Sequence, residues 1–246
     1  MRVALLFAMQ AEAAPVIRAL GLVPGAHSVD ERFGFVQHHG DYRGLQIVLA
    51  TNGHDAVHGV DQIGTQATVL NAYLTLTANQ PDLCINAGTA GGFVKRGGAI
   101  GDVVISNGVV RYHDRRIPIP GFDAYGVGSY PTLVRPEIAT RLGLREGSIS
   151  TSDSLDATPE CHARMDAHDT QAKEMEAASI AWVCAKLAIP FVALKAITDL
   201  VDGGLATETE FLANLHLASE RLCDRVVAFL DLLADEPQVF ALQGDA

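Results

Sequence analysis

Short apolar runs alternate with amphipathic stretches along most of the chain. Val3–Phe7 and Phe191–Leu194 are apolar throughout, which is typical of strands covered on both faces. Asp61–Thr77 and Glu208–Leu233 instead carry patterns that favour helices. Because strands and helices alternate without an internal repeat or a low-complexity linker, we expect one three-layer α/β domain over residues 1–246.

Shorter elements are predicted in the intervals between these four. They are a hairpin at 34–39 and 44–50, strands at 83–86, 100–105, 108–112 and 147–150, and helices from 8 to about 20 and over 136–144. The tail from Asp235 has no periodicity, so we expect residues 235–246 to fray or to pack at the periphery.

The stretch Lys173–Gly204 is predicted to form a helix followed by a buried strand, with acids at both ends. Glu174 and Glu176 open the helix, and Asp199 and Asp202 follow the strand. Polar residues beyond the carboxyl end of a strand in an open parallel sheet usually line the ligand crevice. These acids therefore either face one pocket or serve as helix-dipole and turn residues.

Two further stretches place polar or small residues after a predicted strand. Glu12 lies near the start of the first helix, where it either compensates the helix dipole or contributes a carboxylate to a site. Ala87–Gly92, AGTAGG, has glycines that let a backbone approach a ligand, and Thr89 adds a hydroxyl donor. A tight structural turn explains the same glycines, and the motif is neither a dinucleotide fingerprint nor a P-loop.

Arg111–Gly126 is a long stretch with prolines, glycines and aromatic residues but no periodicity. Such loops are uncommon unless they are functional or cover a partner. His113 and Asp114 adjoin within it, but no further ligands stand at a suitable spacing, so no metal site is predicted.

Composition and charge narrow the class of protein. Of the 246 residues 48% are hydrophobic and 19% charged, which allows a sizeable core. The net charge of −11 and the absence of long basic runs argue against a nucleic-acid partner. No apolar run approaches the length of a membrane span, and the N-terminus is interpreted as a strand. The four cysteines are widely separated, as in a reduced protein, so we expect a soluble cytoplasmic protein without a membrane partner.

Four separated blocks resemble one known family. They are AMQAE (8–12), INAGTAGGFVKRGGAIGDV (85–103), HDRRIPIP (113–120), and STSDSLD through TDLVDG (150–203). Together they resemble the methylthioadenosine/S-adenosylhomocysteine nucleosidases of the nucleoside phosphorylase superfamily, in particular the plant-type branch. The resemblance implies an α/β/α sandwich around a mixed twisted sheet. It also implies hydrolysis of 5'-methylthioadenosine, a nucleoside, to adenine and the 5-thioribose in methionine salvage, without a cofactor. S-adenosylhomocysteine is the second candidate substrate.

The resemblance also implies roles for individual residues. Glu12 matches the acid that deprotonates the attacking water, and Glu176 the glutamate that binds the ribose hydroxyls. Asp199 matches the aspartate that protonates the purine at N7. Residues 113–126 would complete the pocket of a neighbouring subunit in a homodimer.

The remaining substrate contacts follow from the same blocks. Thr89, Ala90 and Gly91 match the loop beside the ribose and base, Met175 matches the residue packed under the ribose, and Thr198 lies beside Asp199. Leu155 and Asp156 match positions against the adenine, and Met9 and Phe211 match part of the alkylthio pocket. Lys195 matches the residue near the water. Leu155 replaces a phenylalanine of the better-known bacterial enzymes, which makes base stacking aliphatic. Lys195 replaces an arginine, which gives a point charge instead of a bidentate fork.

Two rival functions fit the same fold. A phosphorylase would need a phosphate cradle, typically with an arginine near the strand before the glycine segment, but that strand ends in Asn86 without one. A non-enzymatic nucleoside-binding protein would be expected to lack at least one of Glu12, Glu176 and Asp199. Hydrolysis of another adenine nucleoside, such as deoxyadenosine or a futalosine-like compound, stays open because the alkylthio pocket is only partly readable.

Overall fold

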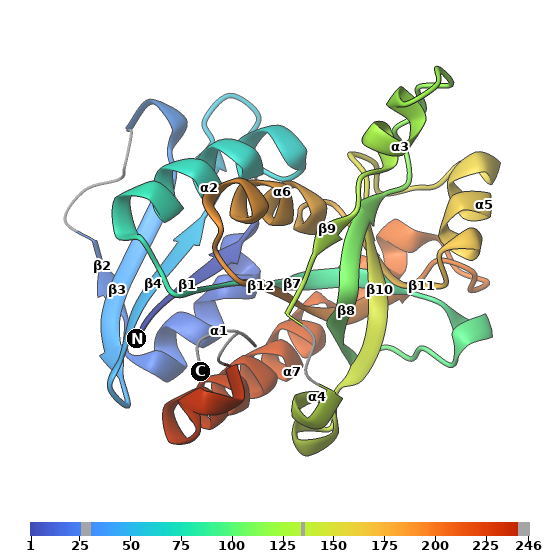
Figure 1. Ribbon diagram of the computed structural model, residues 1–246. Coiled ribbons are helices and arrows are strands. Elements are labelled where there is room, and N and C mark those ends of the chain that lie inside the picture. The colour runs from blue at the N-terminus through green and yellow to red at the C-terminus, as the bar shows by residue number, and fades with distance from the viewer. Residues whose placement is uncertain (26–30, 134–135, 241–246) are drawn as a thin grey trace.

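A mixed sheet runs through the centre of the molecule, with helices on both faces (Figure 1). The computed structural model describes residues 1–25, 31–133 and 136–240. Within them, ten strands pair in the order β11-β10-β8-β12-β7-β1-β4-β3-β2, with β9 attached to β8. They are β1 (Arg2–Phe7), β2 (Val23–Pro24), β3 (Val36–Tyr42), β4 (Leu45–Thr51), β7 (Leu83–Gly92), β8 (Val103–Tyr112), β9 (Tyr130–Pro131), β10 (Arg145–Thr151), β11 (Thr170–Glu174) and β12 (Phe191–Leu200). A separate two-stranded ribbon pairs β5 (His54–Asp55) with β6 (Val60–Asp61).

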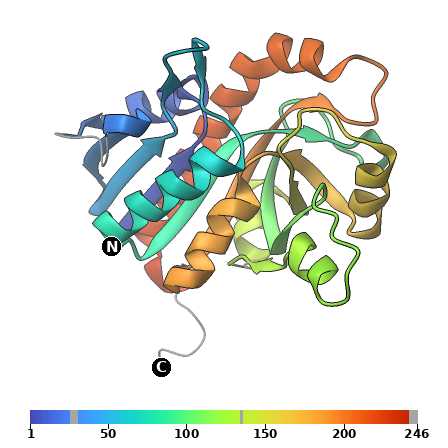
Figure 2. The ribbon, with the colours of Figure 1, turned by 90° about the horizontal axis from the view of Figure 1, so that it is seen from above.

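Seven helices surround the sheet in the described residues, and five of them form its two outer layers. The seven are α1 (Gln10–Leu20), α2 (Thr65–Asn79), α3 (Phe122–Val127), α4 (Pro136–Leu142), α5 (Pro159–Ala167), α6 (Ala177–Leu187) and α7 (Thr207–Asp235), with short 3-10 turns at Glu31–Phe33, Val94–Arg96 and Pro237–Phe240. Helices α2 and α6 lie side by side over one face (Figure 2), and α1, α4 and α7 cover the other. The predicted three-layer α/β architecture with a mixed sheet is thereby confirmed.

Strand β1 shows why both faces must be covered. Val3 and Leu5 belong to the apolar cluster shared with α1 and α7, whereas Ala4 and Leu6 belong to the cluster shared with α2 and α6. Side chains alternate across a strand, so a run that is apolar at every position is stable only between two layers. The apolar run in the sequence therefore predicts the burial of β1 on both faces.

The sheet curls so strongly that one end returns to its own middle. Strand β11 ends one edge of the sheet, yet its Lys173 pairs antiparallel with Gly91 at the far end of β7. Since β7, β12, β8, β10 and β11 are already neighbours in that order, this pairing closes them into a ring. The carboxyl ends of β7, β11 and β12 therefore meet around one space.

Four local predictions are wrong. Lys173 and Glu174 belong to β11, and the helix that they were expected to open begins at Ala177. The segment AGTAGG continues β7 to Gly92 and is not a loop, and β12 likewise runs on to Leu200. The strands expected at 100–105 and 108–112 form the single strand β8.

The C-terminal tail is only partly described. Phe240 is buried and packs edge-on against Phe229 of α7, with ring centroids 5.0 Å apart. This part of the tail is packed and not frayed, and residues 241–246 lie outside the described residues. In the described ranges, none of the helices is both long and apolar enough to cross a membrane.

Candidate active site

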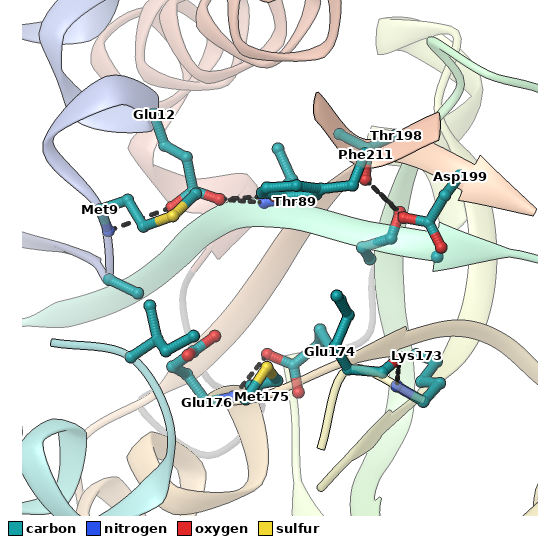
Figure 3. Close-up of a pocket in the computed structure, with 15 residues that line it drawn as sticks. Met9, Glu12, Thr89, Lys173, Glu174, Met175, Glu176, Thr198, Asp199 and Phe211 are labelled. Atoms are coloured by element: carbon teal, nitrogen blue, oxygen red, sulfur yellow. Dashed lines mark hydrogen bonds between the residues drawn. The ribbon is translucent and has the colours of Figure 1, made fainter. Parts of the chain in front are cut away.

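One pocket lies where the carboxyl ends of β7, β11 and β12 meet the first turn of α1 and the start of α7 (Figure 3). The carboxyl ends of neighbouring strands are the usual ligand sites of α/β sheets. The lining residues are Ala8, Met9, Glu12, Ile63, Thr89, Ala90, Gly91, Leu155, Lys173, Glu174, Met175, Glu176, Thr198, Asp199 and Phe211.

A bulge in β12 sets the position of Asp199. The register between β7 and β12 shifts between Ile197 and Asp199, which leaves Thr198 unpaired and sets Asp199 opposite Gly91. The Thr198 hydroxyl donates to Oδ1 of Asp199 at 2.8 Å. A Cβ atom at Gly91 would lie only 2.7 Å from Oδ2 of Asp199, so glycine leaves the space that the carboxyl group occupies.

The environment of Asp199 favours its protonated form. The residue is 3% exposed, and this burial raises its pKa, while the hydrogen bond from Thr198 and the positive charge of Lys173 oppose the rise. A raised pKa is the direction of shift that a general acid requires.

Glu12 is held from both sides of the pocket. Its Oε1 accepts hydrogen bonds from the backbone N–H and the hydroxyl of Thr89, each at 2.7 Å, and its Oε2 accepts one from the N–H of Met9. Glu12 thus closes a capping box on α1 and also lines the pocket, so the two interpretations of its position both apply. Burial raises the pKa of Glu12, and Thr89, Lys195 and Met9 counteract that rise.

Glu176 reaches the pocket from the N-cap position of α6. Its Oε1 accepts a hydrogen bond from the backbone N–H of Gly64, just before α2, at 2.9 Å. Burial and then the negative charge of Glu174 raise the pKa of Glu176 to about 8, against the effects of Lys195 and Gly64. At neutral pH this carboxyl group therefore retains its proton.

A buried ion pair lies behind these acids. Nζ of Lys195 lies 2.9 Å from Oε2 of Glu174, and each side chain is 1% exposed. The same Glu174 oxygen accepts the N–H groups of Glu176 and Ala177, each at 2.8 Å, and Oε1 accepts from the Thr151 hydroxyl. Glu174 therefore fixes the backbone that carries Glu176.

The charges of this pair stabilise each other. Burial alone would raise the pKa of Glu174, but Lys195, Thr151 and the Glu176 N–H together lower it. Burial alone would lower the pKa of Lys195, but Glu174, Glu176 and Glu12 together raise it. The ammonium group of Lys195 thus interacts electrostatically with three acids of the site, Glu174, Glu176 and Glu12.

Most of the site residues that the sequence predicted line this pocket, and two of them, Lys195 and Asp156, do not. Lys195 is buried behind the wall formed by Glu174, and Asp156 is exposed. Leu155 lines the pocket and remains 43% exposed, as a residue at a pocket rim does. Asp202 accepts the N–H groups of Val94 and Lys95, which is the structural one of the two roles that the sequence left open.

The sequence interpretation missed part of the lining. For Glu174 the sequence left two roles open, a pocket acid or a helix-dipole residue, and the side chain both lines the pocket and anchors α6. Lys173, Ile63 and Ala8 were not singled out at all. The sequence did hold a signal for Lys173, because Lys173 and Glu174 follow Thr170–Ala172 directly. Polar residues at the carboxyl end of a strand favour a ligand site. Among the described residues, no three His, Cys, Asp or Glu side chains are grouped to hold a metal ion.

Comparisons with known proteins agree with this geometry. Residues 2–231 match the model of the phosphorylase superfamily. A 5'-methylthioadenosine nucleosidase of Arabidopsis thaliana is 42% identical, with 93% of this chain and 87% of the relative covered. A 5'-methylthioadenosine/S-adenosylhomocysteine nucleosidase of the same plant is 38% identical, with 92% and 89% covered.

A solved structure supports the same relationship. The apo form of the Arabidopsis thaliana 5'-methylthioadenosine nucleosidase superposes with a TM-score of 0.92 at 40% identity, covering 94% of this chain and 95% of that one. The family expected from the four sequence blocks is confirmed. The chain belongs to the phosphorylase superfamily and, within it, to the family of the methylthioadenosine and methylthioadenosine/S-adenosylhomocysteine nucleosidases.

Proposed function

We propose that this protein hydrolyses the N-glycosidic bond of 5'-methylthioadenosine, releasing adenine and the 5-thioribose, as a step of methionine salvage. The observation that carries the proposal is the convergence of Glu12, Glu176 and Asp199 on one pocket, each held by a different hydrogen-bond partner. The activities of the Arabidopsis relatives point to the same reaction. S-adenosylhomocysteine is the second candidate substrate.

The reaction needs an acid and a base on opposite sides of the sugar. Asp199 protonates N7 of adenine as the N9–C1' bond breaks, so that the base leaves as a neutral molecule. Water then attacks C1' of the oxocarbenium-like ribosyl cation from the other face, and Glu12 accepts its proton. Burial raises the pKa of Glu12, and the donors of Thr89 and the charge of Lys195 act against that rise, towards the carboxylate form that a base requires.

Glu176 binds the ribose hydroxyls in this proposal. Its Oε1 is held by Gly64, which leaves Oε2 to face the sugar. The negative charges of Glu174 and Glu12 both raise the pKa of Glu176, so the proton affinity of each acid in the pocket depends on the charge of the others. Entry of a substrate with hydroxyl donors favours the ionised form of Glu176, and that negative charge stabilises the sugar cation.

The apolar lining fits the rest of the nucleoside. Met9 and Phe211 would contact the alkylthio group, Met175 would pack under the ribose, and Leu155 would stack on the adenine. Thr89, Ala90 and Gly91 would lie beside the ribose and base. Asp156 is exposed, so any contact with the adenine edge would come from its backbone.

Hydrolysis is favoured over phosphorolysis by the lining of the pocket. Asn86 ends the apolar part of β7 and donates to the carbonyl of Leu6, so it does not supply a phosphate ligand. Among the described lining residues, none is an arginine, and Lys173 already donates to two carbonyls. Water requires no cationic cradle.

We also propose that the protein is a cytoplasmic homodimer in which residues 113–126 lie near the neighbouring active site. Support comes from three apolar side chains of this segment, Ile119, Phe122 and Tyr125, which are 54%, 55% and 68% exposed. Grouped exposed apolar side chains favour a protein interface.

Adenine release from methylthioadenosine and S-adenosylhomocysteine, measured in parallel without phosphate, tests the proposal. We expect release from methylthioadenosine that neither phosphate nor arsenate accelerates. Release that requires phosphate or arsenate would show a phosphorylase, and absence of release from both substrates would overturn the nucleosidase proposal.

A further inference from the structure

Lys173 is a buried cation of the pocket wall that the catalytic scheme above does not use. It stands in β11 at the point where that strand pairs with Gly91, and Gly91 pairs on its other side with Asp199 of β12. The side chain is 5% exposed and lines the same pocket as Asp199 (Figure 3). Ring closure by β11 thus brings Lys173 and Asp199 to one end of the pocket.

The ammonium group of Lys173 binds two successive carbonyl groups. Nζ donates to the backbone oxygens of Ser154 and Leu155, each at 2.8 Å. Both residues belong to the irregular segment between β10 and α5, where no strand or helix satisfies the backbone. Since Leu155 lines the pocket, these bonds fix one wall of the pocket.

The positive charge of Lys173 also acts on Asp199. The charged groups facing Lys173 are Asp199 of β12, Glu174 of its own strand, Asp156 of the irregular segment and Cys161 of α5, and it acts in turn on His113. The groups that act on Asp199 are Lys173, Glu210 of α7 and the Thr198 hydroxyl. Of these groups Lys173 carries the positive charge, and it lowers the pKa of Asp199.

We propose that Lys173 is a positioning residue for the leaving base, because its ammonium group fixes the Ser154–Leu155 wall and faces Asp199 at the same end of the pocket. This inference rests on the proposed function for the identity of the base. An ammonium group has three protons, and the two carbonyls use two of them, so one remains for another acceptor. A lysine with only a structural role would change stability without changing how the activity depends on pH.

Lys173→Met tests the proposal, since methionine has a similar length but neither charge nor donors. We expect KM for methylthioadenosine to rise about tenfold or more, as loss of charge-assisted hydrogen bonds predicts, with a smaller change in kcat. Without the cation the pKa of Asp199 rises further, so the high-pH limb of kcat/KM moves to higher pH. Lys186→Met in the last turn of α6, outside the pocket lining, is the matched control and should keep wild-type kinetics.

A folded Lys173→Met protein with the wild-type KM and the wild-type high-pH limb would overturn the inference. If that variant does not fold, Lys173→Gln replaces it, because glutamine keeps a donor for a carbonyl but removes the charge, and the same shift of the limb is expected. Wild-type adenine release, measured first, tests the proposed function separately. If the wild type releases no adenine, the inference is tested instead by the equilibrium Kd for adenine of the wild type and the variant. We then expect the variant to bind adenine more weakly, and equal binding would overturn the inference.

Discussion

Glu174 in the pocket wall and Lys195 behind it form a buried, hydrogen-bonded ion pair, 2.9 Å apart and each 1% exposed. Breaking a buried pair leaves a charge without its partner, which typically costs about 3–5 kcal/mol. We therefore expect Glu174→Gln to lower the free energy of unfolding by roughly 3 kcal/mol, measured by urea denaturation.

The control is the double variant Glu174→Gln/Lys195→Met, which removes both charges. It should be less destabilised than the sum of its two single variants, because neither residue then leaves an unpaired charge. Arg43→Ala, which breaks exposed ion pairs with Asp231 and Asp235, should change stability much less. Equal losses for the buried and the exposed pair would contradict this account.

Glu176 makes stability fall as pH rises. Its pKa in the folded protein is about 8, above the ordinary value of 4.5, so the folded state binds a proton more tightly than the unfolded state. Its contribution is therefore fully present below about pH 4.5 and is lost as pH rises through about 8. Glu176→Gln should flatten the unfolding free energy between these values, as measured by denaturation of the ligand-free protein at several pH values. If the unfolding free energy of the variant and of the wild type depended on pH with the same slope, Glu176 would not be the source of the pH dependence.

Gly91 leaves the space in which the carboxyl group of Asp199 lies. In Gly91→Ala the new Cβ atom would meet Oδ2 of Asp199 at 2.7 Å, so the carboxyl group must move. Small displacements of a catalytic group lower rates steeply, and we expect kcat/KM for methylthioadenosine to fall by about tenfold to a hundredfold. Gly204→Ala, whose Cβ would meet nothing within 4 Å, is the control and should keep the wild-type value.

Glu12→Gln separates binding from chemistry. The amide keeps the shape of the side chain and can still accept from Thr89, but it does not take a proton from water. We expect nucleoside binding, measured by calorimetry, to persist while kcat falls by about two orders of magnitude or more. A variant with the wild-type kcat would remove Glu12 from the role of base.

Particular residues show what the sequence could and could not predict. Continuous apolar runs such as that of β1 were sufficient for the layered fold, because only burial on both faces stabilises them. Glu12, Glu176 and Asp199 could be assigned to one pocket through the family's blocks, although they are far apart in the chain.

The closure of the sheet into a ring could not be predicted, and the errors follow from it. Lys173 and Glu174 precede a helical pattern, and a five-residue strand with two charges gives no apolar run. The glycines of AGTAGG have low strand propensity, but pairing with β12 and β11 imposes the extended form. Strand register is a tertiary property, so the meeting of Lys173, Gly91 and Asp199 becomes visible only in three dimensions.

The central claim is that Asp199 supplies the proton that lets adenine leave. Adenine release from methylthioadenosine by Asp199→Asn, in phosphate-free buffer beside the wild type, tests it most directly, with circular dichroism to show that the variant is folded. Loss of general-acid catalysis lowers rates by about 10²–10⁴, and we expect a loss of at least that size in kcat. Near-wild-type release by the folded variant would contradict the account.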